Sequence, residues 1–191
     1  MSDWSSALND GVMLIRNQAR ITIVKPADNE YTVITGFAVC NTSAYGTVAP
    51  YNKNEKNFIW DKNDYKDGYL SLPVDADFQV RLTPGEDVTD NSSRYVFETE
   101  NTADNPVSII LKDDKGMYYR VLLLDGDGNF LNVRRNTSYN LNLEGALTNG
   151  STSFAAALNG PASNNVWISI SDDISTISAV SYTHLTLPTI A

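Results

Sequence analysis

Apolar and polar residues alternate along two segments of the chain, as they do in a β-strand with one buried face. Residues 139–144 alternate without exception, so we expect the side chains of Tyr139, Leu141 and Leu143 to lie in the core. Residues 13–23 alternate in nearly the same way. The apolar residues that share one face of this second segment are Met13, Ile15, Ala19, Ile21 and Ile23.

Further runs of β-branched and aromatic residues predict strands at residues 31–41, 94–98, 108–111, 118–124 and 166–170. Residues 37–40 and 121–124 are apolar on both faces, so we expect them to lie centrally in their sheets. Residues 153–158, followed by Asn159-Gly160, form the one short helical pattern. The sequence therefore predicts an all-β fold, a two-sheet β-sandwich of seven or more strands.

Composition narrows the range of functions. The 191 residues carry a formal net charge of −9, which repels phosphate backbones, so we expect no nucleic-acid partner. No apolar run reaches the roughly 18 residues of a membrane-spanning helix. The single histidine, His184, lies in a C-terminal stretch that we interpret as non-native. Without histidine, imidazole catalysis and histidine metal sites are excluded, and we expect no enzymatic activity, no metal and no cofactor.

Two local motifs invite a chemical interpretation. Cys40, the sole cysteine, lies in a strand-like run, where a buried structural thiol is favoured over a nucleophile that has no histidine base. Residues 125–129, Asp-Gly-Asp-Gly-Asn, resemble the start of a calcium loop. However, Phe130 stands where such a loop needs glycine, and Asn136 stands where it needs its closing glutamate. A hairpin turn is therefore favoured over a calcium site.

Charged residues outside these motifs give weaker signals. Several aspartates occur in polar segments that lack apolar neighbours to shift a pKa, so we expect solvated carboxylates at Asp61, Asp64, Asp67, Asp113 and Asp114. Arg134 and Arg135 precede the strand at Tyr139, where capping of the backbone or a position at the sheet rim is favoured over anion binding.

Three aromatic residues, Trp60, Tyr65 and Tyr69, lie in the polar stretch of residues 51–69. They are candidates for a surface that binds sugars or proteins, and packing under a long loop is the alternative. The alternative function for the whole chain is accordingly a carbohydrate-binding β-sandwich module at the cell surface.

Several short motifs occur in order between residues 12 and 170. They are residues 14–23, the strand 37–41 followed by Gly46-Thr-Val-Ala-Pro50, residues 95–98 before residues 107–112, the paired tyrosines Tyr118 and Tyr119, and Arg135-Asn136-x-x-Tyr139. Together they resemble the N-terminal domain of Bacteroidales fimbrillins, pilus subunits of the FimA and FimB type.

This resemblance implies a transthyretin-like β-sandwich, secretion as a lipoprotein anchored at the outer membrane, and assembly with other subunits into adhesive surface fimbriae. Host glycans or proteins are further implied partners. In the family, a protease removes the first strand, and a strand from a neighbouring subunit fills the exposed groove. We therefore expect residues 13–24 to be exchangeable between molecules, with Arg16 and Arg20 as candidate protease-accessible sites. The alternative is an ordinary, permanently paired strand.

The two ends of the chain differ in sequence character from its middle. Residues 181–189 resemble a translated sequencing-adapter peptide, so we expect a fragment whose native sequence ends near Ala179 or Val180. The expected organisation is a poorly ordered start at 1–11, the sandwich domain at 12–165, and a non-native tail at 181–191. Residues 166–180 are expected to begin a truncated second domain or to form the last strand.

Overall fold

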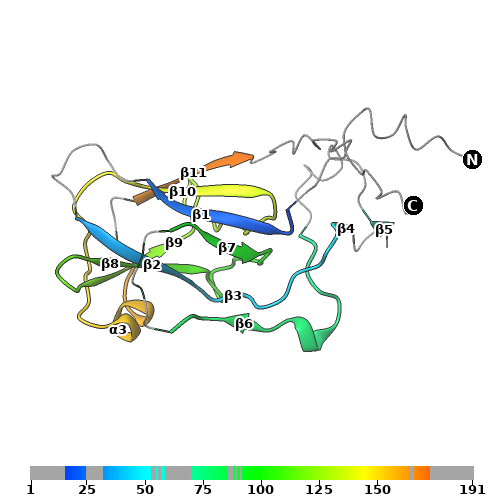
Figure 1. Ribbon diagram of the computed structural model, residues 1–191, viewed down its shortest axis with the longest axis horizontal. Helices are drawn as coiled ribbons and strands as arrows, with labels where there is room; N and C mark the ends of the chain where they lie inside the picture. Colours follow the sequence, from blue (N-terminus) through cyan, green and yellow to red (C-terminus); the bar gives the residue numbers. More distant parts are fainter. Residues whose placement is uncertain are drawn as a thin grey trace, which may run out of the picture.

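Strands in two main sheets dominate the computed structural model, which describes residues 16–24, 32–52, 55, 57–58, 70–85, 88, 90, 92–163 and 166–172. The four-stranded sheet consists, in spatial order, of β11 (Val166–Asp172), β10 (Thr137–Leu143), β1 (Gln18–Val24) and β7 (Arg94–Phe97). The three-stranded sheet consists of β2 (Ile34–Cys40), β8 (Ser108–Asp113) and β9 (Tyr118–Leu122). Figure 1 shows the first sheet stacked over the second.

Shorter elements lie beside these sheets. β3 (Thr42–Ser43) pairs with β6 (Arg81–Leu82), and β4 (Tyr51–Asn52) pairs with β5 (Asn57–Phe58). A 3-10 turn, η1 (Ala76–Phe78), precedes β6. The predicted two-sheet β-sandwich with a short helix at residues 153–158 is confirmed. The expected start at 1–11 and the tail at 181–191 lie outside the described residues.

The main core fills the space between the two large sheets. On β10, Tyr139, Leu141 and Leu143 point inward and are at most 7% exposed, as the alternation predicts. On the facing sheet, Phe37 of β2 and Ile109 of β8 are fully buried in the same cluster. The period-2 pattern of β10 thus marks the face that is removed from water.

The expectation that residues 37–40 and 121–124 lie centrally is wrong. β2 and β9 are the two outer strands of the three-stranded sheet, and β8 lies between them. For residues 37–40 the second apolar face has another cause, because the short helix α3 (Phe154–Asn159) covers the outer side of this sheet (Figure 1). A second cluster there contains Ala38, Cys40, Val88, Ile110, Phe154 and Ala157.

The outer edge of β2 is also covered. The backbone N–H of Phe37 donates to the carbonyl oxygen of Asp90 at 3.3 Å. A side chain at Gly36 would place its Cβ 2.5 Å from the carbonyl oxygen of Val88, so only glycine permits this close approach. β2 can therefore stand at an edge without presenting an open hydrogen-bonding ladder.

Residues 125–129 form a tight turn. The Asp125 carboxylate accepts hydrogen bonds from the backbone N–H groups of Asp127 and Asn129 at 2.9 and 2.8 Å, and Gly128 has φ 84°. An isolated bridge between Leu124 and Phe130 closes the hairpin. The carboxylate therefore organises its own loop, which is the favoured interpretation of this motif.

Candidate functional site

β1 lies in the middle of the four-stranded sheet, between β10 and β7 (Figure 1). It runs parallel to β10, with Ile21 beside Tyr139, and antiparallel to β7, with Ala19 beside Val96. The two flanking strands therefore form the walls of a groove that β1 fills, and this place between β10 and β7 is called the β1 groove below.

The side chains of β1 divide as the sequence predicts. Ala19 and Ile21 are fully buried and Ile23 is 8% exposed, all within the main core. On the outer face, the Arg20 Nε donates to the Ser138 hydroxyl at 2.8 Å, and the hydroxyls of Thr22 and Ser93 lie 3.0 Å apart. The apolar inner face and the polar outer face of β1 are thus both engaged by neighbouring residues.

The remaining candidate residues near β1 differ in their exposure to solvent. Arg16 is exposed just before β1 begins, whereas Arg20 is half-buried within the strand. Met13 and Ile15 lie outside the described residues. Of the two candidate cleavage sites, Arg16 is therefore the more accessible to a protease.

One end of the β1 groove is closed by residues 133–136. Thr99, two residues beyond the end of β7, exchanges two backbone hydrogen bonds of 2.9 Å with Val133. Asn136, directly before β10, donates its N–H to the carbonyl oxygen of Gln18 at 2.9 Å. The segment thus runs from one wall to the other at the point where β1 begins.

A buried ion pair fastens this segment. The Nε of Arg135 lies 2.8 Å from the Oε2 of Glu98, and both side chains are 1% exposed. Glu98 also accepts from the backbone N–H of Ser71 at 3.1 Å, and the Arg135 guanidinium donates to the Thr47 hydroxyl. The predicted position at the sheet rim is wrong for Arg135, because its side chain is buried and a buried carboxylate compensates its charge, while its guanidinium does donate to the backbone carbonyl oxygen of Val48.

Sequence reasoning missed this pair, although one signal was present. Glu98 ends the apolar run that begins at Tyr95, and a carboxylate in such a setting needs a buried cation or several donors. Its partner lies 37 residues away in the chain. Spacing alone therefore gave no indication of which arginine it would be.

The Tyr139 hydroxyl bonds to the backbone next to this segment. It donates to the carbonyl oxygen of Asn132 at 2.6 Å and accepts from the backbone N–H of Arg134 at 2.9 Å. Burial raises the pKa of Tyr139 to about 12, so the hydroxyl keeps its proton at neutral pH. Asn136, where the chain turns into β10, has φ 55°, a left-handed conformation that asparagine tolerates.

Two other predictions concern single polar groups. Cys40 is fully buried, as expected, and burial raises the pKa of its thiol to about 12. The expectation of a solvated carboxylate is wrong for Asp113, which is 3% exposed. Asp113 accepts from the backbone N–H of Met117 at 2.7 Å and from the Tyr119 hydroxyl at 3.0 Å, so it closes the turn between β8 and β9.

The other predicted carboxylates have no part in this site. Asp114 is exposed in the turn that follows β8, as expected. Asp61, Asp64 and Asp67 lie outside the described residues.

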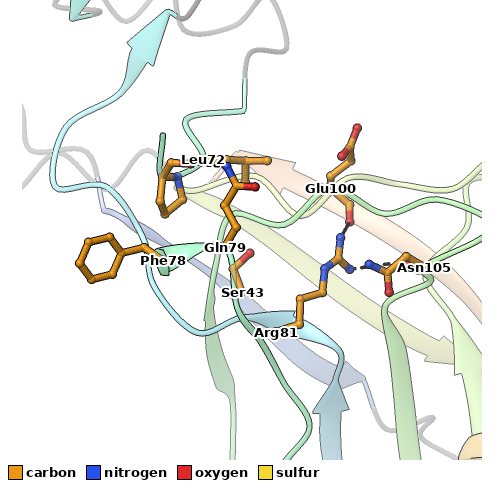
Figure 2. Close-up of a pocket in the computed structure, with 8 residues that line it drawn as sticks. Ser43, Leu72, Phe78, Gln79, Arg81, Glu100 and Asn105 are labelled. Atoms are coloured by element: carbon orange, nitrogen blue, oxygen red, sulfur yellow. Dashed lines mark hydrogen bonds between the residues drawn. The ribbon is translucent and has the colours of Figure 1, made fainter. Parts of the chain in front are cut away.

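A pocket of about 320 Å³ lies beside η1 and β6 (Figure 2). Arg81 lines it and donates to the carbonyl oxygens of Glu100 and Asn105 at 2.6 and 3.1 Å. Phe78 also lines the pocket and packs edge-on against Tyr45 with ring centroids 5.2 Å apart, and each of the two side chains is 48% exposed. The predicted surface aromatics Trp60, Tyr65 and Tyr69 lie outside the described residues.

Within the described ranges, no group of three or more His, Cys, Asp or Glu side chains is arranged to hold a metal ion. Among the same residues, no helix is both long enough and apolar enough to cross a membrane.

Comparison with protein families and with curated proteins gives no match. Among solved structures, the chain is similar to the tip fimbrial protein Mfa3 from Porphyromonas gingivalis, with TM-score 0.46 and 16% identity over 83% of this chain and 52% of that one. It is also similar to a proposed cell adhesion protein from Bacteroides uniformis, with TM-score 0.38 and 12% identity over 83% of this chain and 52% of that one. A proposed cell adhesion protein from Parabacteroides distasonis gives TM-score 0.32 and 15% identity over 82% of this chain and 51% of that one. The chain spans about half the length of these structures, and scores this low do not define a common fold.

Proposed function

We propose that this protein is a structural and adhesive subunit of a cell-surface fimbria, and that subunits join by strand exchange at the β1 groove. The observation that carries the proposal is the position of β1. It is the first described strand, yet it lies between two strands that it holds together, with a fully apolar inner face.

Loss of β1 would destabilise the sandwich, and binding of another strand in its place would restore the lost contacts. Removing it uncovers two fully buried residues, Tyr139 at 1% and Leu141 at 0% exposure, and leaves backbone groups of β7 and β10 without partners. A strand with the same alternation of apolar and polar residues restores both the burial and the backbone hydrogen bonds. Each isoleucine that it buries contributes about 2 kcal/mol to the free energy of binding. The groove is therefore suited to bind an extended segment of a neighbouring subunit.

The sequence motifs support the same proposal. Arg135-Asn136-x-x-Tyr139, which resembles a fimbrillin motif, forms the closed end of the β1 groove, and Arg16 is exposed just outside it. On this proposal, cleavage at Arg16 precedes loss of β1. The partners are other fimbrial subunits and, at the tip, host glycans or proteins. The full-length precursor is a lipoprotein of the outer membrane with a transthyretin-like sandwich.

Deletion of residues 1–24 tests this function. The truncated chain is expected to lose its folded structure or to self-associate, and a peptide of residues 11–25 is expected to restore a folded monomer with saturable binding. A matched peptide with Ile21→Asp is the control, because it places a charge at a fully buried position. A truncated chain that remains folded and monomeric and binds neither peptide would contradict the proposal.

A second candidate function, carbohydrate binding, is favoured by one observation. Tyr45 and Phe78 expose an aromatic surface beside a pocket lined by Gln79, Glu100 and Asn105. Aromatic faces combined with planar polar side chains suit the apolar and hydroxyl-bearing faces of a sugar. Glycan-array binding that Phe78→Ala abolishes and Val24→Ala leaves unchanged would favour this candidate.

A further inference from the structure

The β1 groove needs walls that stay apart when β1 is absent. In the described sheet, β7 and β10 each pair with β1 rather than with one another, so their separation is two strand spacings, about 10 Å. Unpaired strands with apolar inner faces tend to close on each other or to separate. Something other than β1 must therefore fix this distance if the emptied groove is to bind a new strand.

We propose that the closed end of the groove is a brace that holds β7 and β10 at this separation and keeps the emptied groove ready for an incoming strand. The brace consists of Glu98 and Thr99 just after β7, Val133 and Arg135 just before β10, and Tyr139 of β10, which fastens the segment around Val133 to its own strand. This inference rests on the proposed function, because the brace matters only if β1 leaves.

The bonds that define the brace join its own residues rather than β1. Thr99 and Val133 bond to each other through both backbone groups, and the Arg135–Glu98 pair joins the residue after β7 to a residue just before β10. A second, independent fastening comes from Tyr139, whose hydroxyl holds the backbone at Asn132 and Arg134. These bonds can therefore persist when β1 is replaced.

Burial makes this brace stiff. Separating the Arg135–Glu98 pair would leave two charges in a site with 1% exposure, which is far more costly than opening an exposed pair. The Arg94–Asp90 pair near the start of β7 is more exposed, with side chains 26% and 61% accessible, and it ties β7 only to the segment just before that strand. The walls are thus fixed firmly at the end where β1 begins.

A brace of this kind predicts a specific kinetic signature. A pre-formed groove raises the rate at which a strand binds, because no wall movement precedes contact. It has little effect on the rate of release, because the contacts of the bound strand are unchanged. Loss of general stability acts in the opposite way, mainly by speeding release.

The test uses the whole chain, cut once between β1 and β2 at residues 25–31, with labelled peptide 11–25 exchanged into the groove. Association and release rate constants are measured for the parent, for Glu98→Gln with Arg135→Met, and for Tyr139→Phe. Glu98→Gln retains an acceptor for the Ser71 N–H, and Tyr139→Phe retains the buried ring, so at least one variant is expected to fold. Phe154→Leu, in the outer cluster, is the destabilised control.

Both brace variants are expected to bind peptide about tenfold more slowly than the parent, as when one molecule in ten keeps an open groove, with release within about twofold. Phe154→Leu is expected to leave association unchanged. Association at the parent rate in the brace variants, or equal slowing in Phe154→Leu, would overturn the brace. A parent chain that takes up no peptide would instead contradict the proposed function and, with it, the premise of the brace.

Discussion

At the scale of single residues, the most informative pair is Arg135 and Glu98. A buried ion pair is not in itself a source of stability, because the desolvation of both charges offsets their attraction. Here each partner also satisfies backbone or hydroxyl groups of other segments, at Ser71 and Thr47. The pair therefore fixes the relative positions of several segments.

Removing one partner should therefore cost more than removing the charges together. Arg135→Met leaves the Glu98 carboxylate buried without its cation, and we expect a loss of about 3–5 kcal/mol in the free energy of unfolding. Adding Glu98→Gln should recover about 2 kcal/mol of this loss. Urea unfolding of the single and double variants measures the difference. A double variant that is less stable than the single one would contradict this account of the pair.

Tyr139 should make stability depend on alkaline pH. Its pKa is raised from 10.0 to about 12 in the folded chain, so between these values the unfolded chain loses a proton that the folded chain keeps. Each pH unit in this window therefore lowers stability by about 1.4 kcal/mol, and the effect is absent below about pH 10. We expect Tyr139→Phe to be about 1–2 kcal/mol less stable than the parent at neutral pH, because two hydrogen bonds are lost.

The same substitution removes the titrating group. The stability gap between parent and Tyr139→Phe should accordingly shrink above about pH 10, close near about pH 11 and reverse sign toward about pH 12. Urea unfolding at about pH 8 and about pH 11 provides the comparison, and other groups that titrate in this range cancel in the difference. A gap that stays constant would show that the hydroxyl ionises as readily in the folded as in the unfolded chain.

At the scale of elements, α3 explains why one sheet is apolar on both faces. The helix begins at Ser153, whose side chain accepts from the Ala156 N–H, and it lays Phe154 and Ala157 on the outer side of β2 and β8. Its cluster includes the single thiol, Cys40. The three-stranded sheet is therefore covered twice, by β1 and its neighbours on one face and by α3 on the other.

Loss of the Phe154 ring should expose Cys40. Phe154→Ala is expected to cost about 3 kcal/mol and to speed the reaction of Cys40 with a thiol reagent, because a side chain that covers it is removed. Ala155→Ser, at an exposed position of the same helix, is the control and should leave both quantities unchanged. Unchanged labelling in Phe154→Ala would mean that other residues shield the thiol.

The local sequence pattern predicted the strands and the helix better than it predicted which segments pack beside one another. The strict alternation near Tyr139 placed its face in the core, because burial of one face imposes that period. Residues 37–40, which are apolar on both faces, led to the wrong prediction of a central strand. An apolar outer face arises equally from a helix that covers the sheet and from a central position in it. The pairing of Glu98 with Arg135 and the parallel pairing of β1 with β10 join distant segments, and local periodicity carries no information on such pairs.

At the scale of the whole molecule, the sandwich is organised around a strand near the start of the described chain. The buried face of β1, its two walls and the closed end of the groove come from three separate parts of the sequence, because the closed end is formed by the residues that follow β7 and precede β10. On the proposed function, one strand is replaced while the covalent chain of the remaining sandwich stays intact. It is the physical basis of the proposed assembly.

Exchange of β1 between molecules tests this claim most directly. The chain is cut once between β1 and β2, mixed with an excess of isotopically labelled peptide 11–25, and the composition of the folded protein is followed by mass spectrometry. We predict that labelled peptide replaces β1 while the core remains folded, and that the Ile21→Asp peptide does not. Retention of the original β1 until the whole domain unfolds would contradict the account, because β1 would then be a permanent strand of the sandwich.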